Sequence, residues 1–416
     1  MDFILRHRMF VSFKYLSFRL YYMALLCQRA AMNMQMVARS LLIYRLTGSG
    51  TIMGAMFLAN ALPMMGLSLF AGVIADRVQR KYVLLAGQAA SAFVALSVAV
   101  SLTVGYLSSE NPGSWWILIF ASVGQGFITG FMTPSRQAMI SEIVSKEHIM
   151  NAVALNTLGM NVLRLMAPAV AGFLIDWLDF EAVYYTMTVM YLLSIIFIVF
   201  LPLNQKIKDA KNEFIKRKGV LHEIREGFRY ILNEGSILLI LFLVLFAVLL
   251  SRPYIMLMPI FTDDILKVGA SGMGVLLSIS GLGAMIGSIS LAGMLNKKRG
   301  LMLIISCLLL GIVLVSFSFS NSWYLSMALM ALIGVGHSAR MTLGNSLILY
   351  YTEEKYQGRV MSFYELNHGI TSLGTFFAGL LADLIGVRWA LGSFSIVLII
   401  MAVMALIFSP RIRKLN

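Results

Sequence analysis

The sequence predicts an all-α polytopic membrane protein with twelve transmembrane helices in two pseudo-symmetric six-helix bundles. Long apolar segments, basic charge in alternate loops and one long central polar segment predict this fold. Of the 416 residues, 59% are hydrophobic and 12% are charged, whereas about 25% are charged in soluble domains. A helix of about 20 apolar residues spans the hydrocarbon core. Backbone amides there must be bonded within the segment, and segments of this length without strand-like alternation are helices.

The apolar segments place the expected helices in order along the chain. They cover residues 17–46, 51–74, 81–107, 114–140, 149–177 and 182–203, and then 236–260, 268–294, 299–320, 322–351, 357–384 and 387–409. We therefore expect an N-terminal bundle over 1–203, a cytoplasmic linker over 204–235 and a C-terminal bundle over 236–416. Within the linker, apolar and charged residues alternate at helical spacing from Val220 to Leu232. This pattern predicts an amphipathic helix along the cytoplasmic surface.

Basic residues gather on one side of the expected membrane. They occupy both tails, the linker and the loops 77–81, 136–146, 297–299 and 355–359, whereas the loops 108–114 and 176–181 carry none. The positive-inside rule therefore places both termini in the cytoplasm. We expect the protein to lie in the cytoplasmic (inner) cell membrane. The formal charge of +14 needs no nucleic acid partner, because membrane topology accounts for it. No cleavage site follows a short apolar run near the N-terminus, so we expect the first span to be retained.

The chain lacks the patterns of several other classes of protein. Cys27 and Cys307 both fall in apolar spans, which leaves no disulfide framework or zinc spacing. No P-loop is present, and no nucleophile has a base at catalytic spacing. We therefore expect neither an enzyme nor a cofactor.

The two halves resemble each other in short segments that recur in the same order. Ala171-Gly172-Phe173-Leu174-Ile175-Asp176 in the fifth span matches Ala378-Gly379-Leu380-Leu381-Ala382-Asp383 in the eleventh, and Gly124-Gln125-Gly126 matches Gly334-Val335-Gly336. Corresponding spans run in the same direction, as in parallel repeats about an axis normal to the membrane. A repeated bundle with a central cavity is the arrangement of an alternating-access carrier.

The loop after the second span carries the most specific motif. Gly72-Val73-Ile74-Ala75-Asp76-Arg77-Val78-Gln79-Arg80-Lys81 resembles the signature of the major facilitator superfamily. The resemblance implies a conformational latch formed by Gly72, Asp76, Arg77 and Arg80. The alternative is a basic turn that only sets topology. The counterpart over 293–299 has no acidic residue.

Further segments resemble the exporter branch of that family, which includes the enterobactin exporter and macrolide-efflux-type carriers. These are 41–49, Thr133-Pro134-Ser135-Arg136, 167–172 and 358–361. Pro168 and Gly172 are similar to an antiporter element of the fifth helix, which implies a hinge at an outward gate. A plain packing kink is the alternative. Met32 stands near the place where the family commonly has an acidic residue in the first span, which puts coupling by that route in doubt.

Charged side chains inside the spans indicate the cargo. Arg29, Arg39, Arg164, Arg252 and Arg340 lie within spans, against one comparably deep acid, Glu365. Each buried charge needs a partner or a water-filled cavity. An excess of positive charge favours an anionic solute. The alternative is that an arginine reaches the lipid headgroups or bonds to backbone carbonyls. For Arg39 and Arg252 this alternative has the same weight as a position in the cavity.

Polar neighbours complete the candidate substrate site. Its members are Arg29, Asn33, Gln125, Thr129, Asn161, Arg164, Arg252, His337 and Arg340. These polar side chains can also hold helices together by hydrogen bonds. Glu365 and His368 form the candidate proton-coupling site, with Arg340 as a modulator. A static pair of Arg340 with Glu365 is the alternative. A metal held by Glu365, His368 and His337 lacks a motif, so we expect none.

These observations predict a secondary carrier that exports an amphipathic, anionic, siderophore-like organic solute by alternating access and proton coupling. The expected partners are the small-molecule substrate, the lipid bilayer and protons, and a monomer suffices because the repeat supplies the symmetry. A broad multidrug or macrolide exporter is one alternative, to which the 29 Met and 26 Phe would be suited. A membrane sensor that binds ligand without transport is the other.

Overall fold

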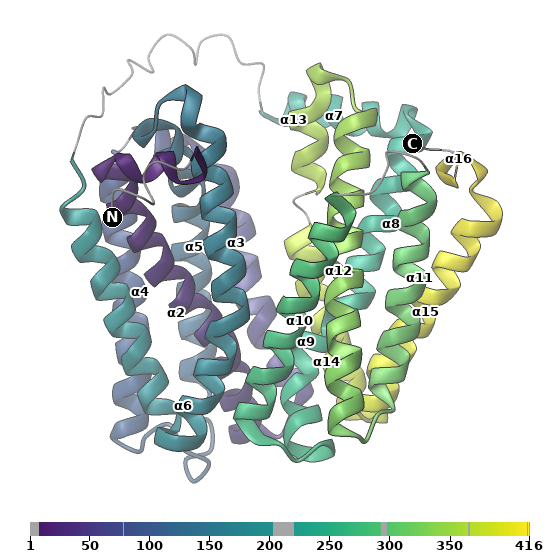
Figure 1. Ribbon diagram of the computed structural model, residues 1–416. Coiled ribbons are helices and arrows are strands. Elements are labelled where there is room, and N and C mark those ends of the chain that lie inside the picture. The colour runs from purple at the N-terminus through teal and green to yellow at the C-terminus, as the bar shows by residue number, and fades with distance from the viewer. Residues whose placement is uncertain are drawn as a thin grey trace. The chain divides into compact units, whose positions relative to one another are not determined.

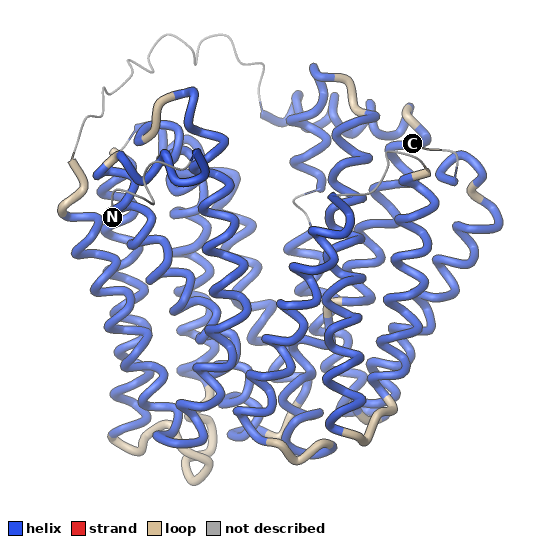
Figure 2. The backbone as a smooth tube through the Cα atoms, viewed as in Figure 1, coloured by secondary structure: helices blue, strands red, loops and turns tan. Residues whose placement is uncertain are grey.

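The computed structural model describes residues 8–77, 79–202, 220–292, 298–364, 367–413 and 415. Every regular element in these ranges is helical, and none of them contains a strand (Figure 2). Within the same ranges, nine helices are long and apolar enough to cross a membrane. The all-α membrane fold predicted from the apolar segments is therefore confirmed.

The helices of the first half follow the expected spans. They are η1 (Arg8–Lys14), α2 (Leu16–Thr47), α3 (Gly50–Arg77), α4 (Arg80–Thr103), α5 (Trp116–Ile143), η2 (Lys146–His148) and α6 (Ile149–Val199). The fifth and sixth expected spans both lie in α6, which changes direction at Asp179 (φ 69°, ψ 176°). A single non-helical residue therefore makes the turn between two spans.

The helices of the second half are more often interrupted. They are α7 (Val220–Asn233), α8 (Gly235–Ser251), α9 (Pro253–Ile260), η4 (Phe261–Ile265), α10 (Gly269–Ala292), α11 (Arg299–Ser318), α12 (Trp323–Tyr351), α13 (Glu354–Tyr364), α14 (Asn367–Ile385), α15 (Val387–Phe408) and α16 (Pro410–Arg413). The seventh expected span divides into α8 and α9 because Pro253 has no amide hydrogen and starts a new helix. The eleventh expected span contains both α13 and α14.

The chain forms two compact units, which contain the helices labelled in Figure 1. Unit 1 consists of Met1–Gly48, Ala59–Asn212 and Gly269–Val275, and unit 2 of Ser49–Leu58, Glu213–Val268 and Leu276–Asn416. Helix α3 therefore begins in unit 2 and continues in unit 1. Helix α10 does the reverse, beginning in unit 1 and continuing in unit 2.

Each unit has its own apolar core. In unit 1, α2 and α4 both pack against α6, and Phe18, Leu84 and Leu155 are buried between helices. In unit 2, α11 packs against α12 and α15. A Cβ atom on Gly311 would lie 2.7 Å from Cγ1 of Ile399, so α11 and α15 approach as closely as small residues allow.

The linker helix α7 packs against α13 inside unit 2. Glu226 forms an ion pair with Arg359 at 2.8 Å, and the rings of Tyr230 and Tyr356 stack with centroids 4.1 Å apart. Ile231 is buried, whereas Phe228 is half exposed. One face of this amphipathic helix is therefore covered by protein. Its position along the cytoplasmic surface stays a prediction.

Candidate functional site

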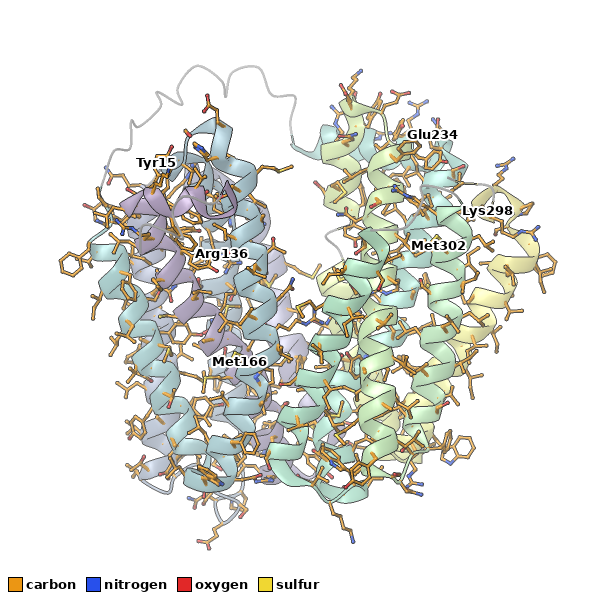
Figure 3. All side chains as sticks on the ribbon, in the orientation of Figure 1. Tyr15, Arg136, Met166, Glu234, Lys298 and Met302 are labelled. Atoms are coloured by element: carbon orange, nitrogen blue, oxygen red, sulfur yellow. The ribbon has the colours of Figure 1, made fainter. Side chains whose placement is uncertain are left out.

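A cationic cluster lies among the membrane helices of unit 1. Arg136 on α5 is labelled in Figure 3. Arg29 on α2 is half-buried, and its guanidinium group is near enough to that of Arg136 for the two charges to repel each other. Tyr21 lies near both groups, and its hydroxyl donates to the carbonyl oxygen of Arg136 at 2.7 Å. Within the described ranges, no carboxylate forms an ion pair with Arg29. Two neighbouring guanidinium groups attract an anion.

The sequence did not indicate the part played by Arg136, because this residue falls in a loop rich in basic residues. Its place within α5, beside Tyr21, is visible only in the fold. A small cavity adjoins the cluster and is lined by Tyr21, Ala24, Leu25, Gln28, Leu84, Gln88, Arg136 and Ile198. Such a space suits ordered water rather than an organic solute.

Arg39 on α2 has a different environment. It is 9% exposed, and its Nη1 donates to the hydroxyl of Ser122 on α5 at 3.2 Å. Tyr184 and Tyr191, both on α6 and fully buried, lie within electrostatic reach of its guanidinium group. Arg39 on α2 therefore lies among side chains of α5 and α6 in unit 1.

Two polar candidates of unit 1 bind to nearby protein groups. The amide of Asn33 donates to the carbonyl oxygen of Arg29 on its own helix at 2.8 Å. The amide of Gln125 donates to the hydroxyl of Ser91 at 3.4 Å. Thr129, Asn161 and Arg164 are half-buried, and their side chains form no hydrogen bond with other described residues. The structure thus brings Arg29 and Asn33 together but gives no contact that joins the other candidates to them.

Among the described residues of unit 2, Arg340 on α12 has a fully buried guanidinium group. Its exposed fraction is 0%, and its Nη2 lies 3.3 Å from Nδ1 of His337, one helical turn earlier. The Nε and Nη1 atoms have no hydrogen-bond partner in the part of the chain that the structure describes. A buried donor without a partner costs about 1–3 kcal/mol or more. Arg340 therefore has donors that a ligand would satisfy.

Aromatic hydroxyls and a thiol surround Arg340. Tyr254 on α9, Tyr364 on α13 and Cys307 on α11 all lie within electrostatic reach of its guanidinium group. Sequence reasoning missed the two tyrosines, since they lie 86 residues before and 24 residues after Arg340 and belong to no motif. Arg252 is half-buried at the junction of α8 and α9. The side chains of Glu365 and His368, the candidate coupling pair, lie outside the described residues.

The loop that carries the family signature forms contacts inside unit 1. Arg80 forms an ion pair with Glu142 on α5, and its Nη1 also donates to the carbonyl oxygen of Ala138 at 3.3 Å. Lys81 donates to the carbonyl oxygens of Val199 and Leu201, each at 2.8 Å, and so caps the end of α6. The side chains at Gly72, Asp76 and Arg77 lie outside the described ones. Lys81 and Glu142 are contact residues that the sequence analysis did not assign to the latch.

The expected hinge residues lie where α6 meets the start of α10. A Cβ atom on Gly172 would be 2.3 Å from the carbonyl oxygen of Ala270, and one on Gly274 would be 2.4 Å from that of Pro168. The assigned helix continues through Pro168. These residues therefore form a surface of very close helix packing, and a hinge at Pro168 stays a prediction.

Comparison with known proteins places the chain in a family. The family model described as "Transmembrane secretion effector" matches residues 8–415. The staphyloferrin A transporter of Staphylococcus aureus is 25% identical over 80% of this chain and 82% of its own. The multidrug efflux pump Tap of Mycolicibacterium fortuitum is 23% identical over 94% of this chain and 95% of its own.

Solved structures share the fold at low sequence identity. A peptide transporter crystallised with sulfate has a TM-score of 0.74 and 12% identity, and the match covers 96% of both chains. The nucleoside transporter NupG has a TM-score of 0.72 and 13% identity over 94% of this chain and 99% of its own. These relatives are membrane transporters of small molecules and not enzymes. The chain belongs to the transmembrane secretion effector family of major facilitator transporters.

Proposed function

We propose that this transporter exports an amphipathic organic anion by alternating access, with the proton gradient as its source of energy. The observation that carries the proposal is the state of Arg340, which is fully buried while two of its nitrogen atoms lack partners among the described residues. A charged residue in the middle of a membrane costs about 2.5–3.5 kcal/mol on insertion scales. A carboxylate on the solute would offset that cost by accepting from the guanidinium group.

The cluster of Arg29 and Arg136 in unit 1 supports the same charge preference. Two guanidinium groups close together destabilise each other, and an anion near both would relieve the repulsion. Each repeat of the chain thus contributes cationic side chains to its own membrane helices. The staphyloferrin A transporter among the relatives makes a siderophore-like solute the first to test.

Transport in reconstituted vesicles tests this charge preference. Proteoliposomes preloaded with staphyloferrin A, the anionic probe, should take up labelled staphyloferrin A by counterflow. Unlabelled anion outside the vesicles should inhibit this uptake, whereas tetraphenylphosphonium, a lipophilic cation, should not. Inhibition by the cation alone would contradict the proposal.

Proton coupling is proposed for Glu365 and His368 because they are a carboxyl group and an imidazole close together in an apolar segment of the sequence, where ionisable residues are often functional. The replacement Glu365→Gln should abolish substrate-driven proton flux while substrate exchange at equal pH on both sides continues. Unchanged proton flux would remove this role.

A broad multidrug exporter is the second candidate function. The relative Tap, which matches nearly the whole chain, is a multidrug efflux pump. Competition by several structurally unrelated cations in the same counterflow assay would favour this candidate over an exporter of anions.

A further inference from the structure

Two acidic side chains cap the starts of two helices in a matching way. The first is Asp383 near the end of α14. Its carboxylate accepts from the amides of Gly50 and Thr51 at 2.7 and 2.9 Å, and from the hydroxyl of Ser49 at 2.7 Å. These groups lie at the start of α3, where backbone amides have no partner within the helix. Asp383 therefore caps a helix that lies more than 300 residues away in sequence.

The second is Asp176 in α6. Its carboxylate accepts from the amides of Ala270 and Ser271 at 3.3 and 2.8 Å, and the hydroxyl of Ser271 donates to it as well. These groups form the first turn of α10. A carboxylate at this place also interacts favourably with the positive end of the helix dipole.

The two contacts occupy equivalent positions in the repeats. Asp176 ends the segment 171–176 and Asp383 ends the matching segment 378–383. The glycine four residues before each aspartate packs on the backbone of the capped helix. A Cβ atom on Gly172 would lie 2.3 Å from the carbonyl oxygen of Ala270, and one on Gly379 would lie 2.1 Å from that of Gly50. In both repeats a close backbone contact thus accompanies the cap.

Each capped segment belongs to the unit of its aspartate. Residues 49–58 group with unit 2, although the rest of α3 belongs to unit 1. Residues 269–275 group with unit 1, although the rest of α10 belongs to unit 2. The caps therefore hold the starts of the two helices that run from one unit into the other.

We propose that Asp176 and Asp383 are paired positioning residues of the transport cycle, which hold the starts of α10 and α3 in this conformation and release both in the alternate one. This inference rests on the alternating-access part of the proposed function and is independent of the charge of the solute. An alternating carrier needs contacts that are present in one state only, because only these shift the equilibrium between the states.

The contacts are suited to repeated release. Both carboxylates are exposed to solvent, and water replaces them on the amides when they leave. One cap changes a conformational equilibrium by about fivefold. Because the two helix starts have equivalent caps, releasing either one would require a similar free energy.

Hydrogen exchange of the full-length protein in detergent tests the inference by its cross-effect. In the variant Asp383→Asn, residues 49–58 should exchange faster, and so should residues 269–275, which Asp383 does not contact. The reciprocal result is expected for Asp176→Asn. Asparagine has one side-chain oxygen where the carboxylate uses two, so each variant loses a hydrogen bond and exchange should increase about fivefold. Both substitutions keep the volume of the side chain, so the variants are expected to fold.

The variant Asp179→Asn is the matched control. Asp179 is an exposed carboxylate three residues after Asp176, and among the described residues it accepts from the adjacent amide of Phe180 at 3.0 Å and from no other helix. This variant should leave exchange at both segments unchanged. Faster exchange confined to the segment that each aspartate caps would mean two static caps, and the inference would then be wrong. A protein that passes this test but fails anion counterflow would refute the proposed cargo and leave the paired release standing.

Discussion

Arg39 and Arg340 are both arginines buried among membrane helices, but their surroundings differ. Arg39 donates to Ser122 and lies beside two buried tyrosines of α6. Arg340 contacts His337, while its Nε and Nη1 atoms lack partners within the described ranges. The difference teaches that burial alone does not identify a binding residue. Both arginines have aromatic neighbours, but Arg39 bonds to a hydroxyl of another helix, whereas the described contacts of Arg340 leave two of its nitrogen atoms for a ligand.

The largest effect is expected for transport in Arg340→Met. Loss of a charge-assisted hydrogen bond to the solute costs about 1.5–3 kcal/mol, which is a loss of about 10- to 100-fold in kcat/KM for the anion. The melting temperature should stay unchanged or rise, because the removed charge is buried and has no carboxylate partner among the described residues. Counterflow and thermal unfolding in detergent measure the two quantities. A large drop in melting temperature would assign Arg340 to the scaffold.

The converse is expected for Arg39→Met. This change leaves the buried hydroxyl of Ser122 without its donor and removes the cation beside Tyr184 and Tyr191. The free energy of unfolding should fall by about 1–3 kcal/mol. The KM for the anion should change less than threefold in the protein that remains folded, since the described contacts of Arg39 are with protein side chains. A selective rise in KM would erase the distinction between the two arginines.

The cluster of Arg29 and Arg136 in unit 1 is an intermediate case between Arg39 and Arg340. Replacing Arg29 by Gln removes a charge that is half-buried and repelled by Arg136. We expect the KM for the anion to rise about tenfold, as for one charged hydrogen bond, with no loss of thermal stability. The replacement Arg19→Gln is the control, because Arg19 is a half-buried arginine of the same helix, α2, and is not a member of the candidate site. An equal rise in both variants would point to general electrostatic attraction rather than to a site at Arg29.

The smallest effect is expected at the loop of the family signature. Glu142→Gln breaks the ion pair with Arg80, both partners being partly exposed. Pairs of this kind contribute about 0.2–1 kcal/mol, so the melting temperature should change little. Lys81→Met should cost more, because two carbonyl oxygens at the end of α6 lose their donor. If Glu142→Gln lowered the melting temperature more than Lys81→Met, the ion pair, and not the cap, would hold this loop.

The sequence was sufficient for the helical fold and insufficient for the distinction between the two arginines. Apolar segments of the length of a bilayer dictate helices, and α4, α11 and α15 follow the expected spans closely. The break before Pro253 and the turn at Asp179 depend on single residues, whose effect on a span varies with its packing. Arg39 and Arg340 both stand in apolar runs, and nothing local separates them. Their partners come from other helices, which only the tertiary fold brings near.

The repeats also have contacts that could not be predicted from the sequence. The matching segments that end at Asp176 and Asp383 were visible in the sequence. Their role as caps was not, because the capped amides lie 94 and 333 residues away. Arg136 likewise belonged to a basic loop and to a segment that resembles the exporter branch, but its position beside Tyr21 is seen only in the fold. Repeated motifs thus indicate equivalent positions, while their contacts follow from packing.

The most direct measurement compares the binding of an anionic solute and of its neutral methyl ester to purified wild-type protein and to Arg340→Met. We expect the wild type to bind staphyloferrin A at least tenfold more tightly than its methyl ester. The variant should bind both with similar affinity. Equal affinities in the wild type, or a preference that survives in Arg340→Met, would contradict the claim that the buried guanidinium group selects the anion.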